Sequence, residues 1–417
     1  MVFMTISVFT PSHNPKWLTE TYESLITQSY EDWEWVVLLN NGAEWKPPKR
    51  DKRIKVVQAT TETKAVGALK REAVSLCGGE ILLELDHDDK LMPTALEKVA
   101  EAFSENEGVG FVYSDFAQIN EDGTPNFNEF DSRFGWSYRD EDGYHITNSK
   151  SPHPHHISLI WFAPNHLRAF TRKAYDSANG YNPGLEILDD QDLMCRLYLQ
   201  TKFHHIKENL YLQRIHANQT QADPQINPKI QAGTLELYNI YISDLLLKWA
   251  GDNHLRALDL GGAHNPKPGF QTVDLHDADI VGDIFDVLAS MPDNSVGVIR
   301  AADFLEHIPD KIGLWNEMYR VLADGGMVLS ITPSTDGRGA FQDPTHNSFY
   351  NENSFWYFID ENFRRFVPEL KMDFQTSRLL TYFPSEFHQK HNISYVLANL
   401  IAVKGEERFG GWRGAQV

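Results

Sequence analysis

The sequence predicts an α/β protein of two domains. Strand-like apolar runs alternate with helical patterns over the first 220 residues. The alternation restarts after a polar, proline-containing segment at residues 222–230. A chain of 417 residues also exceeds the usual single domain of about 150 residues. We therefore expect one domain over residues 1–222, a linker and connecting helix over 223–253, and a second domain over 254–417.

The first domain alternates strands and helices from its start. Short apolar runs predict strands at residues 6–9, 35–39, 54–57 and 80–85. Helical spacing of apolar side chains after Pro15 predicts a helix at residues 17–26. A second helix is expected at residues 64–76, ended by Gly78 and Gly79. Because open α/β sheets bind ligands beyond the carboxyl ends of their strands, the loops after these strands are the places to look for a site.

The second domain follows the same logic after an amphipathic helix that carries Leu235, Tyr238 and Ile242 on one face. Strands are expected at residues 255–260, 271–273, 296–300, 327–331 and 395–403. Helices are expected at residues 311–322 and 353–358. The fold class is therefore α/β in both halves.

Composition excludes several classes of protein. The formal charge is −20, from 38 basic and 58 acidic residues, so nucleic acid is not an expected partner. Two cysteines, Cys77 and Cys195, cannot form a disulfide framework. No apolar run approaches the 18 or more residues of a membrane span, and the N-terminus lacks the basic region of a signal peptide. We expect a cytoplasmic protein without a transmembrane segment.

An acidic turn follows the most apolar strand pattern of the first domain. It carries Asp86, Asp88 and Asp89. Three neighbouring carboxylates repel one another unless a cation offsets their charge. Mg²⁺ and Mn²⁺ prefer such oxygen ligands and commonly bridge to substrate phosphates. The alternative is a solvated acidic turn without a ligand.

Further segments accompany the turn in a fixed order. They are Thr10–Asn14, Gln28–Glu34, Gly67–Arg71, Leu91–Pro93, Leu188–Leu197 and Tyr211–His216. Together with the acidic turn, this order resembles the family 2 glycosyltransferases of GT-A type. The resemblance covers residues 5–220 and implies a GT-A α/β/α sandwich. It also implies transfer of a sugar, with inversion, from a nucleotide-sugar donor to a hydroxyl of a glycan or similar acceptor, with a divalent metal ion (Mn²⁺ or Mg²⁺).

The resemblance also implies roles for individual residues. Asp88 is expected to be the main metal ligand, His216 a second ligand, and Asp190 the general base. The expected donor-binding residues are Thr10, Pro11, Asn40, Gly67, Arg71 and Asp86. Asp189 and Asp192 either share the site or are acidic residues of a helix start, which the helix dipole favours.

Two features depart from simple expectation. Family members usually carry paired aspartates after the second strand, where this chain has Asn40-Asn41-Gly42. Asparagine can still donate to and accept from a nucleobase, so a UDP-sugar is expected but the base stays open. His153-Pro154-His155-His156 resembles a metal site in composition, yet a flexible loop on the acceptor side is expected.

The second domain carries a glycine turn, Asp259 to Ala263, after a strand, and Asp274 at the end of the next strand. With Phe304–Ile308 and Gly325-Gly326, these residues resemble class I S-adenosylmethionine-dependent methyltransferases, and Gln342–His346 recurs in one branch of them. The resemblance implies a Rossmann-like fold. The residues that it implies for the cofactor are Asp259, Gly261, Gly262, Asp274 and Asp283. Ala263 departs from the pattern, which has glycine there.

Three functional hypotheses remain open from the sequence. The first is a bifunctional glycosyltransferase and methyltransferase. The second keeps sugar transfer but makes the C-terminal half a non-catalytic binding or dimerisation module. The third treats the acidic turn as a metal site for phosphoryl or nucleotidyl transfer.

Overall fold

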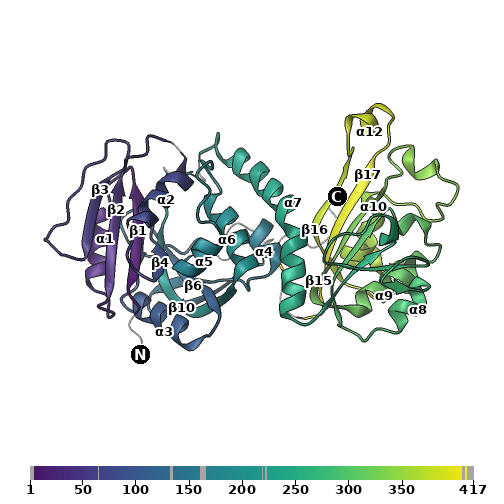
Figure 1. The fold of residues 1–417 in the computed structure, drawn as a ribbon, viewed down its shortest axis with the longest axis horizontal. Coiled ribbons are helices and arrows are strands. Elements are labelled where there is room, and N and C mark those ends of the chain that lie inside the picture. The colour runs from purple at the N-terminus through teal and green to yellow at the C-terminus, as the bar shows by residue number, and fades with distance from the viewer. Residues whose placement is uncertain are drawn as a thin grey trace. The chain divides into compact units, whose positions relative to one another are not determined.

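The computed structural model describes residues 4–63, 65–131, 135–159, 166–217, 219–220, 223–405 and 409–410. The chain forms two compact units, Met1–Ser132 with Trp136–Ile242, and Ser243–Val417. The division falls inside helix α7 (Asn227–Asp252), the long teal-green helix of Figure 1. This helix starts within the polar segment read as part of the linker, because Pro228 stands at a helix start, where its missing N–H costs nothing.

The first unit is built on a mixed sheet that has ten strands in the described residues, with β3-β2-β1-β4-β9-β6-β10-β5 in spatial order. Strands β3, β2, β1 and β4 are mutually parallel. The strands are β1 (Ile6–Ser12), β2 (Trp33–Leu39), β3 (Ile54–Gln58), β4 (Ile81–Glu84), β5 (Lys90–Leu91), β6 (Val109–Ile119), β7 (Ser137–Glu141), β8 (Tyr144–Asn148), β9 (Arg168–Thr171) and β10 (Lys202–Arg214). The helices are α1 (Leu18–Ile26), α2 (Val66–Ser75), α3 (Ala95–Glu105), α4 (Pro154–Leu159), α5 (Arg172–Ser177) and α6 (Asp189–Gln200).

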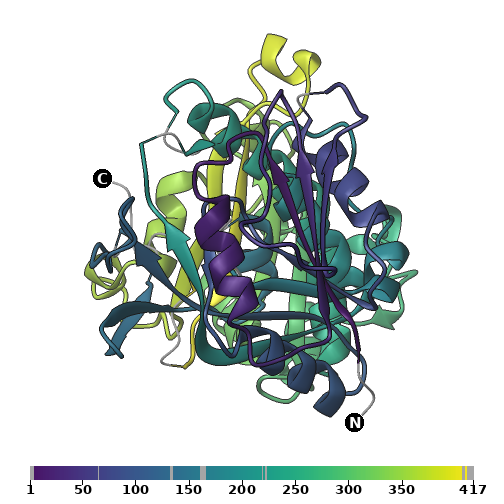
Figure 2. The ribbon, with the colours of Figure 1, turned by 90° about the vertical axis from the view of Figure 1, so that its left-hand side faces the viewer.

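Helices cover both faces of this sheet. The chain moves outward from β1 to β2 through α1 and returns from β3 to β4 through α2. Right-handed crossovers in opposite directions place the two helices on opposite faces, as Figure 2 shows. Apolar side chains from strands and helices fill the space between them, with Trp35 and Val8 fully buried. The reversal of direction between β1 and β4 makes their carboxyl ends a topological switch point.

The second unit has a sheet of seven strands in the described residues, ordered β13-β12-β11-β14-β15-β17-β16. The neighbours from β13 to β15 are parallel, and β17 runs antiparallel to both of its neighbours. The strands are β11 (Arg256–Leu260), β12 (Gln271–Asp274), β13 (Ile280–Val281), β14 (Val296–Ala302), β15 (Leu322–Pro333), β16 (Phe374–Tyr382) and β17 (Tyr395–Ala402). The helices are α8 (Ile284–Ala289), α9 (Lys311–Val321), α10 (Glu352–Ile359), α11 (Glu361–Arg364) and α12 (Glu386–Lys390), with short 3₁₀ helices η3 (Gly262–His264), η4 (Leu305–His307) and η5 (Gly339–Phe341).

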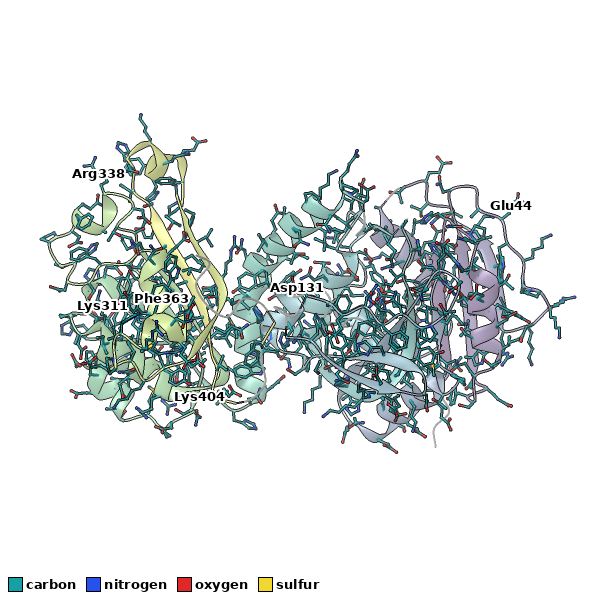
Figure 3. The ribbon with its side chains drawn as sticks, turned by 180° about the vertical axis from the view of Figure 1, so that it is seen from behind. Glu44, Asp131, Lys311, Arg338, Phe363 and Lys404 are labelled. Carbon is teal, nitrogen blue, oxygen red and sulfur yellow. The ribbon has the colours of Figure 1, made fainter. Side chains whose placement is uncertain are left out.

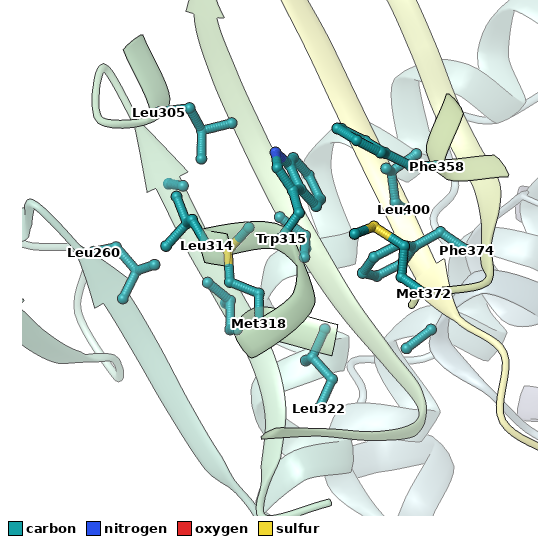
Figure 4. Close-up of a cluster of buried hydrophobic side chains, with 14 of the residues drawn as sticks. Leu260, Leu305, Leu314, Trp315, Met318, Leu322, Phe358, Met372, Phe374 and Leu400 are labelled. Carbon is teal, nitrogen blue, oxygen red and sulfur yellow. The ribbon is translucent and has the colours of Figure 1, made fainter. Parts of the chain in front are cut away.

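The core of the second unit centres on Trp315 of α9 (Figure 4). Its ring lies 4.7 Å from that of Phe358 and 5.6 Å from that of Phe374, measured between centroids. All three side chains are buried. These contacts tie α9 and α10 to the strand pair β16–β17, so the antiparallel edge belongs to the same core as the parallel strands.

The α/β class predicted from the sequence is confirmed in both units, and each strand predicted there overlaps a strand of the structure. The sequence analysis did not predict β16, the two-residue strands β5 and β13, or the strands β6, β7, β8, β9 and β10 of the first unit. The expectation of a loop at residues 153–156 was wrong. Helix α4 starts at Pro154, and His155 and His156 are fully buried.

Candidate active site

A cavity of about 350 Å³ opens at the switch point of the first unit. Pro11 lies near the carboxyl end of β1, Asn40 follows β2, and the acidic turn comes just after β4, so three parallel strands end at this cavity. Residues of α2, of β9 and the segment just before it, of the start of α6 and of the end of β10 with the segment after it also line the cavity. Residues that the sequence analysis assigned to the site meet here: Pro11, Asn40, Asp86, Asp88, Asp190 and His216.

Asp88 and His216 are direct neighbours in the cavity. His216 Nε2 lies 2.8 Å from Asp88 Oδ2. The imidazole packs on the indole of Trp17, with ring centroids 4.6 Å apart. Six-coordinate ligand atoms at about 2.1 Å from an ion lie about 3 Å from one another. The separation of this nitrogen and oxygen therefore suits two ligands of one divalent cation.

Arg214, the last residue of β10, holds the acidic turn. Its side chain is fully buried, and Nε donates to the carbonyl of Asp88 at 2.8 Å. Its backbone N–H donates to Asp89 Oδ1 at 2.7 Å, while Tyr211 donates its hydroxyl to Asp89 Oδ2 at 2.8 Å. The Asp89 carboxylate thus links the acidic turn to β10 through two hydrogen bonds. Burial, with Asp88 and Asp86 nearby, raises the pKa of Asp89.

Asp86 is a second carboxyl of the turn whose charged form is disfavoured. Burial raises its pKa to about 7, and the carboxylates of Glu84 and Asp88 add to that rise. Ligand atoms of Asp86, Asp89 and His166 lie within 4.8 Å of one another. Burial lowers the pKa of His166, so its imidazole is neutral and can be a ligand. The positive charge around Asp86 is therefore too small to offset its burial and the neighbouring carboxylates.

Two buried basic residues offset part of the negative charge. Lys70 Nζ lies 2.8 Å from Glu84 Oε1 and 2.8 Å from Asp189 Oδ2. Arg168 donates to Asp190 Oδ2 at 2.6 Å. Seven acidic side chains nevertheless line the cavity. Among the described lining residues, the lysine and arginine side chains are those of Lys70 and Arg168. Such an excess of negative charge fits a site that binds a cation.

Asp190 is placed to act on a ligand in the cavity. It stands in the first turn of α6, and its side chain is 31% exposed, whereas that of Arg168 is 8% exposed. Burial disfavours its charged form, but Arg168 and Lys70 outweigh this and lower its pKa. The carboxylate is therefore ionised, with lone pairs that Arg168 does not use.

The second unit has its own switch point, between β11 and β14. Asp259 at the end of β11 is fully buried, and both of its oxygens accept from Arg300 Nη1, at 2.7 and 2.9 Å. Gly261 has a left-handed backbone, with φ at +71°, and a Cβ there would lie 2.7 Å from the ring of Phe304. A Cβ at Gly262 would lie 2.7 Å from the Asp259 carboxylate.

Comparison with known families decides what the two units are. Residues 7–166 match the family model for glycosyl transferase family 2. Residues 245–330 match a methyltransferase domain model. The chain joins a family 2 glycosyltransferase domain to a methyltransferase domain.

The glycosyltransferase domain is also similar to curated proteins. These are chondroitin synthase of Escherichia coli (23% identical over 227 residues, 52% of this chain and 29% of that protein), hyaluronan synthase of Pasteurella multocida (22% over 223 residues, 52% and 21%) and the O-antigen biosynthesis protein RfbC of Myxococcus xanthus (28% over 218 residues, 49% and 15%). The matched region spans less than a third of the length of each of them.

The structure of this chain is also similar to solved structures of TarS from S. aureus. The complex with UDP matches with a TM-score of 0.42 and that with UDP-GlcNAc with 0.44, both at 15% identity. Each match covers 60% of this chain, and 71% and 72% of the respective structures.

Among the described helices of the present chain, none has the length and apolar character that crossing a membrane requires.

Three residues assigned to donor binding lie outside the lining of the glycosyltransferase cavity: Thr10, Gly67 and Arg71. Thr10 is fully buried, donates to the carbonyl of Leu85 and accepts from Trp35. Arg71 donates to the carbonyls of Asn179 and Tyr181, each at 2.9 Å.

Gly67 allows a close backbone contact, since a Cβ there would lie 2.1 Å from the carbonyl oxygen of Asn182.

Two further acidic residues, Asp189 and Asp192, lie at the start of α6. Asp189 pairs with Lys70, and Asp192 pairs with Arg196 through Oδ2 and accepts from Tyr241 through Oδ1. Both lie in the first turn of the helix, where the dipole favours negative charge. The helix-start interpretation of these residues agrees with their contacts, although Asp189 also borders the cavity.

Sequence reasoning did not find Lys70, Glu84, Arg168 and His166. Glu84 offered a signal, because it is the charged residue in a fully buried strand whose other residues are all apolar. Lys70 lies one turn after Gly67 on the same helix face, but nothing in the sequence paired it with Asp189. Arg168 and His166 come from β9 and the residues just before it, whose place beside β4 follows from the sheet order alone.

Proposed function

We propose that the first unit is a metal-dependent, inverting glycosyltransferase that moves a sugar from a nucleotide-sugar donor to a hydroxyl of a glycan. The observation that carries the proposal is the gathering of Asp88, His216 and Asp190 around one cavity at the strand ends. The similarity to proteins named chondroitin synthase and hyaluronan synthase supports a glycan acceptor.

Asp88 and His216 are the proposed metal ligands, with Asp86 beside them. When bound, the ion neutralises the charge that builds on the departing nucleoside diphosphate. Burial raises the pKa of Asp86 to about 7, and a bound cation beside it would favour its ionised form. Asn40 and Pro11, at the ends of β2 and β1, border the same cavity and are proposed to contact the donor. We propose a UDP-sugar as the donor.

Asp190 is the proposed general base. Its ionised carboxylate accepts the proton of the acceptor hydroxyl as the oxygen attacks the anomeric carbon. Arg168 holds Oδ2 at 2.6 Å, and the backbone N–H of Gln191 holds Oδ1 at 2.8 Å. These two contacts fix the orientation of the carboxylate, at the cost of some basicity.

The experiment that tests the first unit measures donor cleavage and product. The full chain is incubated with Mn²⁺ and UDP- or GDP-sugars, with and without oligosaccharide acceptors. We expect UDP release that requires Mn²⁺ and a glycosylated acceptor. Transfer of a phosphoryl or nucleotidyl group instead would support the alternative metal chemistry and contradict this proposal.

For the second unit we propose S-adenosylmethionine binding and methyl transfer to the same class of glycan. The methyltransferase model covers residues 245–330, which include all five residues assigned to the cofactor. We assign Asp274, at the end of β12, to ribose hydroxyls; the left-handed backbone of Gly261, as a glycine turn needs, supports this proposal. When bound, the cofactor supplies the methyl group.

The fit to that cofactor is partial. Both oxygens of Asp259 accept from Arg300, and the ring of Phe304 packs closely against Gly261 of the glycine turn. Asp283 caps α8 by accepting from the N–H of Phe285. These contacts favour a second candidate, a unit that keeps the fold as a non-catalytic module. Titration calorimetry with S-adenosylmethionine distinguishes them, because only the cofactor-binding unit releases or absorbs heat.

A further inference from the structure

A cluster of metal-ligating side chains in the second unit has no role in the function proposed above. One ligand atom each of Glu306, His307 and His346 lies within 4.8 Å of the other two. Glu306 and His307 belong to η4, directly after β14, at the carboxyl edge of the sheet. His346 comes from the segment Gln342–His346, which the fold brings back to the same place.

The hydrogen bond of His346 fixes which of its nitrogens is free. Its Nδ1 lies 2.9 Å from the carbonyl oxygen of Ala340. A carbonyl oxygen only accepts, so Nδ1 carries the proton. The lone pair of the neutral ring is then on Nε2, for which the described residues offer no hydrogen-bonding partner.

His307 is held in the same tautomer by a short relay. The Thr345 hydroxyl donates to Asp343 Oδ1 at 2.7 Å, because the carboxylate can only accept. The hydroxyl oxygen therefore accepts from His307 Nδ1, which lies 3.1 Å away. Nε2 of His307 is again the nitrogen with the free lone pair.

Glu306 supplies the carboxylate and is 2% exposed. Its Oε2 accepts from the hydroxyl of Thr332 at 2.6 Å. Each of the three candidate ligands is thus oriented by a polar neighbour, from Ala340, Thr345 or Thr332. Metal-binding side chains in proteins are oriented by outer partners of this kind.

The segment that carries His346 is fastened to η4. The backbone N–H groups of Asn347 and Ser348 both donate to the carbonyl of Glu306, at 2.8 Å. Lys311, labelled in Figure 3 at the start of α9, donates to the carbonyl of Phe349 at 3.4 Å. The ligand geometry is therefore set before any ion binds, which lowers the entropic cost of binding.

We propose that Glu306, His307 and His346 bind a divalent transition-metal ion. Two imidazoles and one carboxylate suit Mn²⁺, Fe²⁺, Co²⁺ or Zn²⁺ better than Mg²⁺ or Ca²⁺, which prefer oxygen alone. Three protein ligands leave coordination positions open for water or for a hydroxyl oxygen of a substrate. This site is distinct from Asp88 and His216, and its binding of an ion does not depend on methyl transfer.

The test uses the full chain carrying Asp88→Ala and His216→Ala, so that the candidate site of the first unit is weakened. Co²⁺ is titrated into this parent by calorimetry, and visible absorption reports coordination by imidazole. We expect His307→Gln and His346→Gln, each added to the parent, to remove one equivalent of bound Co²⁺ or to weaken its binding at least ~100-fold. The control is His276→Gln, which changes an exposed histidine of the same unit.

A second variant keeps the result interpretable if a histidine substitution disturbs folding. Thr345→Val leaves all three ligands in place but removes the relay to His307, and it should weaken Co²⁺ binding by about 10–100-fold. Circular dichroism and thermal unfolding of each variant report folding. Equal Co²⁺ binding by the parent and by the His307 and His346 variants, or no binding by a folded parent, would overturn the proposal. Either result leaves sugar transfer by the first unit unaffected.

Discussion

His216 Nε2 and Asp88 Oδ2 lie 2.8 Å apart although 128 residues separate them in the chain. The contact exists because β10 pairs with β5, the two-residue strand that directly follows the acidic turn. Arg214 then links the end of β10 to Asp88 by a second hydrogen bond. The two candidate metal ligands are therefore positioned by the sheet itself, from segments far apart in the sequence of the domain.

Replacing either of these ligands should weaken donor binding only when metal is present. Asp88→Ala and His216→Ala each remove one direct ligand, so the loss should exceed the ~10–100-fold that loss of a supporting contact costs. Calorimetry with UDP in Mn²⁺ and in EDTA measures both states. Equal affinity of wild type and both variants in Mn²⁺ would show that the ion, if bound, is held elsewhere.

Asp190→Asn should abolish sugar transfer while leaving donor binding intact. The amide preserves the shape of the side chain and can still accept from Arg168, but it cannot take a proton. Loss of a general base lowers kcat by about 10²–10⁴-fold. Transfer rates and donor affinity are measured together, with Asp176→Asn on the exposed end of α5 as the matched control. An unchanged kcat would exclude Asp190 as the base.

Glu84→Gln should reduce stability in a pH-dependent way. Burial opposes the charge of Glu84, but Arg168, Lys70 and the hydroxyl of Tyr181 lower its pKa from 4.5 to about 2. A carboxyl with a lowered folded pKa adds stability above pH 4.5, and this is lost as the pH falls through 2. Removing one partner of a buried ion pair costs about 3 kcal/mol.

Urea unfolding at pH 7 and at pH 2.5 checks this. The difference in the free energy of unfolding between wild type and Glu84→Gln should be large at pH 7 and smaller at pH 2.5. The exposed Glu186→Gln should show no such change. A difference that is constant over this range would mean that Glu84 is not the ionised member of the network.

Gly67→Ala should destabilise the first unit rather than alter donor affinity in the folded fraction. The new Cβ would lie 2.1 Å from the carbonyl oxygen of Asn182, so backbone has to shift. Overpacking of this kind costs about 1–3 kcal/mol. Gly251→Ala, near the end of α7 with open space around it, should instead be neutral or stabilising. A raised KM for the donor with unchanged stability would instead support the donor-binding role that the sequence predicts for Gly67.

Strand-end residues were the predictable part of the candidate site. Asp86 and Asp88 follow a strongly apolar strand, and strand ends meet at one edge in a parallel sheet, so local patterns sufficed. Arg168 was not predictable in this way, because β9 runs antiparallel between β4 and β6, and no local pattern states which strands become neighbours. Lys70 was hidden for a similar reason, since its partners Glu84 and Asp189 come from a strand and a helix far apart in sequence.

The same limit applies to contacts that only the fold reveals. Thr10, Gly67 and Arg71 stand in the expected segments, and their contacts with Leu85, Asn182 and Asn179 join residues far apart in the sequence. In the second unit, the glycine turn was visible in the sequence, but the pairing of Asp259 with Arg300 was not. Two residues on neighbouring strands meet only once the order of those strands is fixed.

By itself, the sequence determined the α/β class, the two-part organisation and the loops where chemistry gathers, because periodicity and turn residues are local properties of the chain. Only the tertiary structure decided which charges face one another: His216 beside Asp88, Arg168 on Asp190, and His346 with Glu306. The physical reason is that the energy of a charge or a lone pair depends on neighbours a few ångströms away in space. Those neighbours come from segments whose adjacency is set by the packing of the whole sheet.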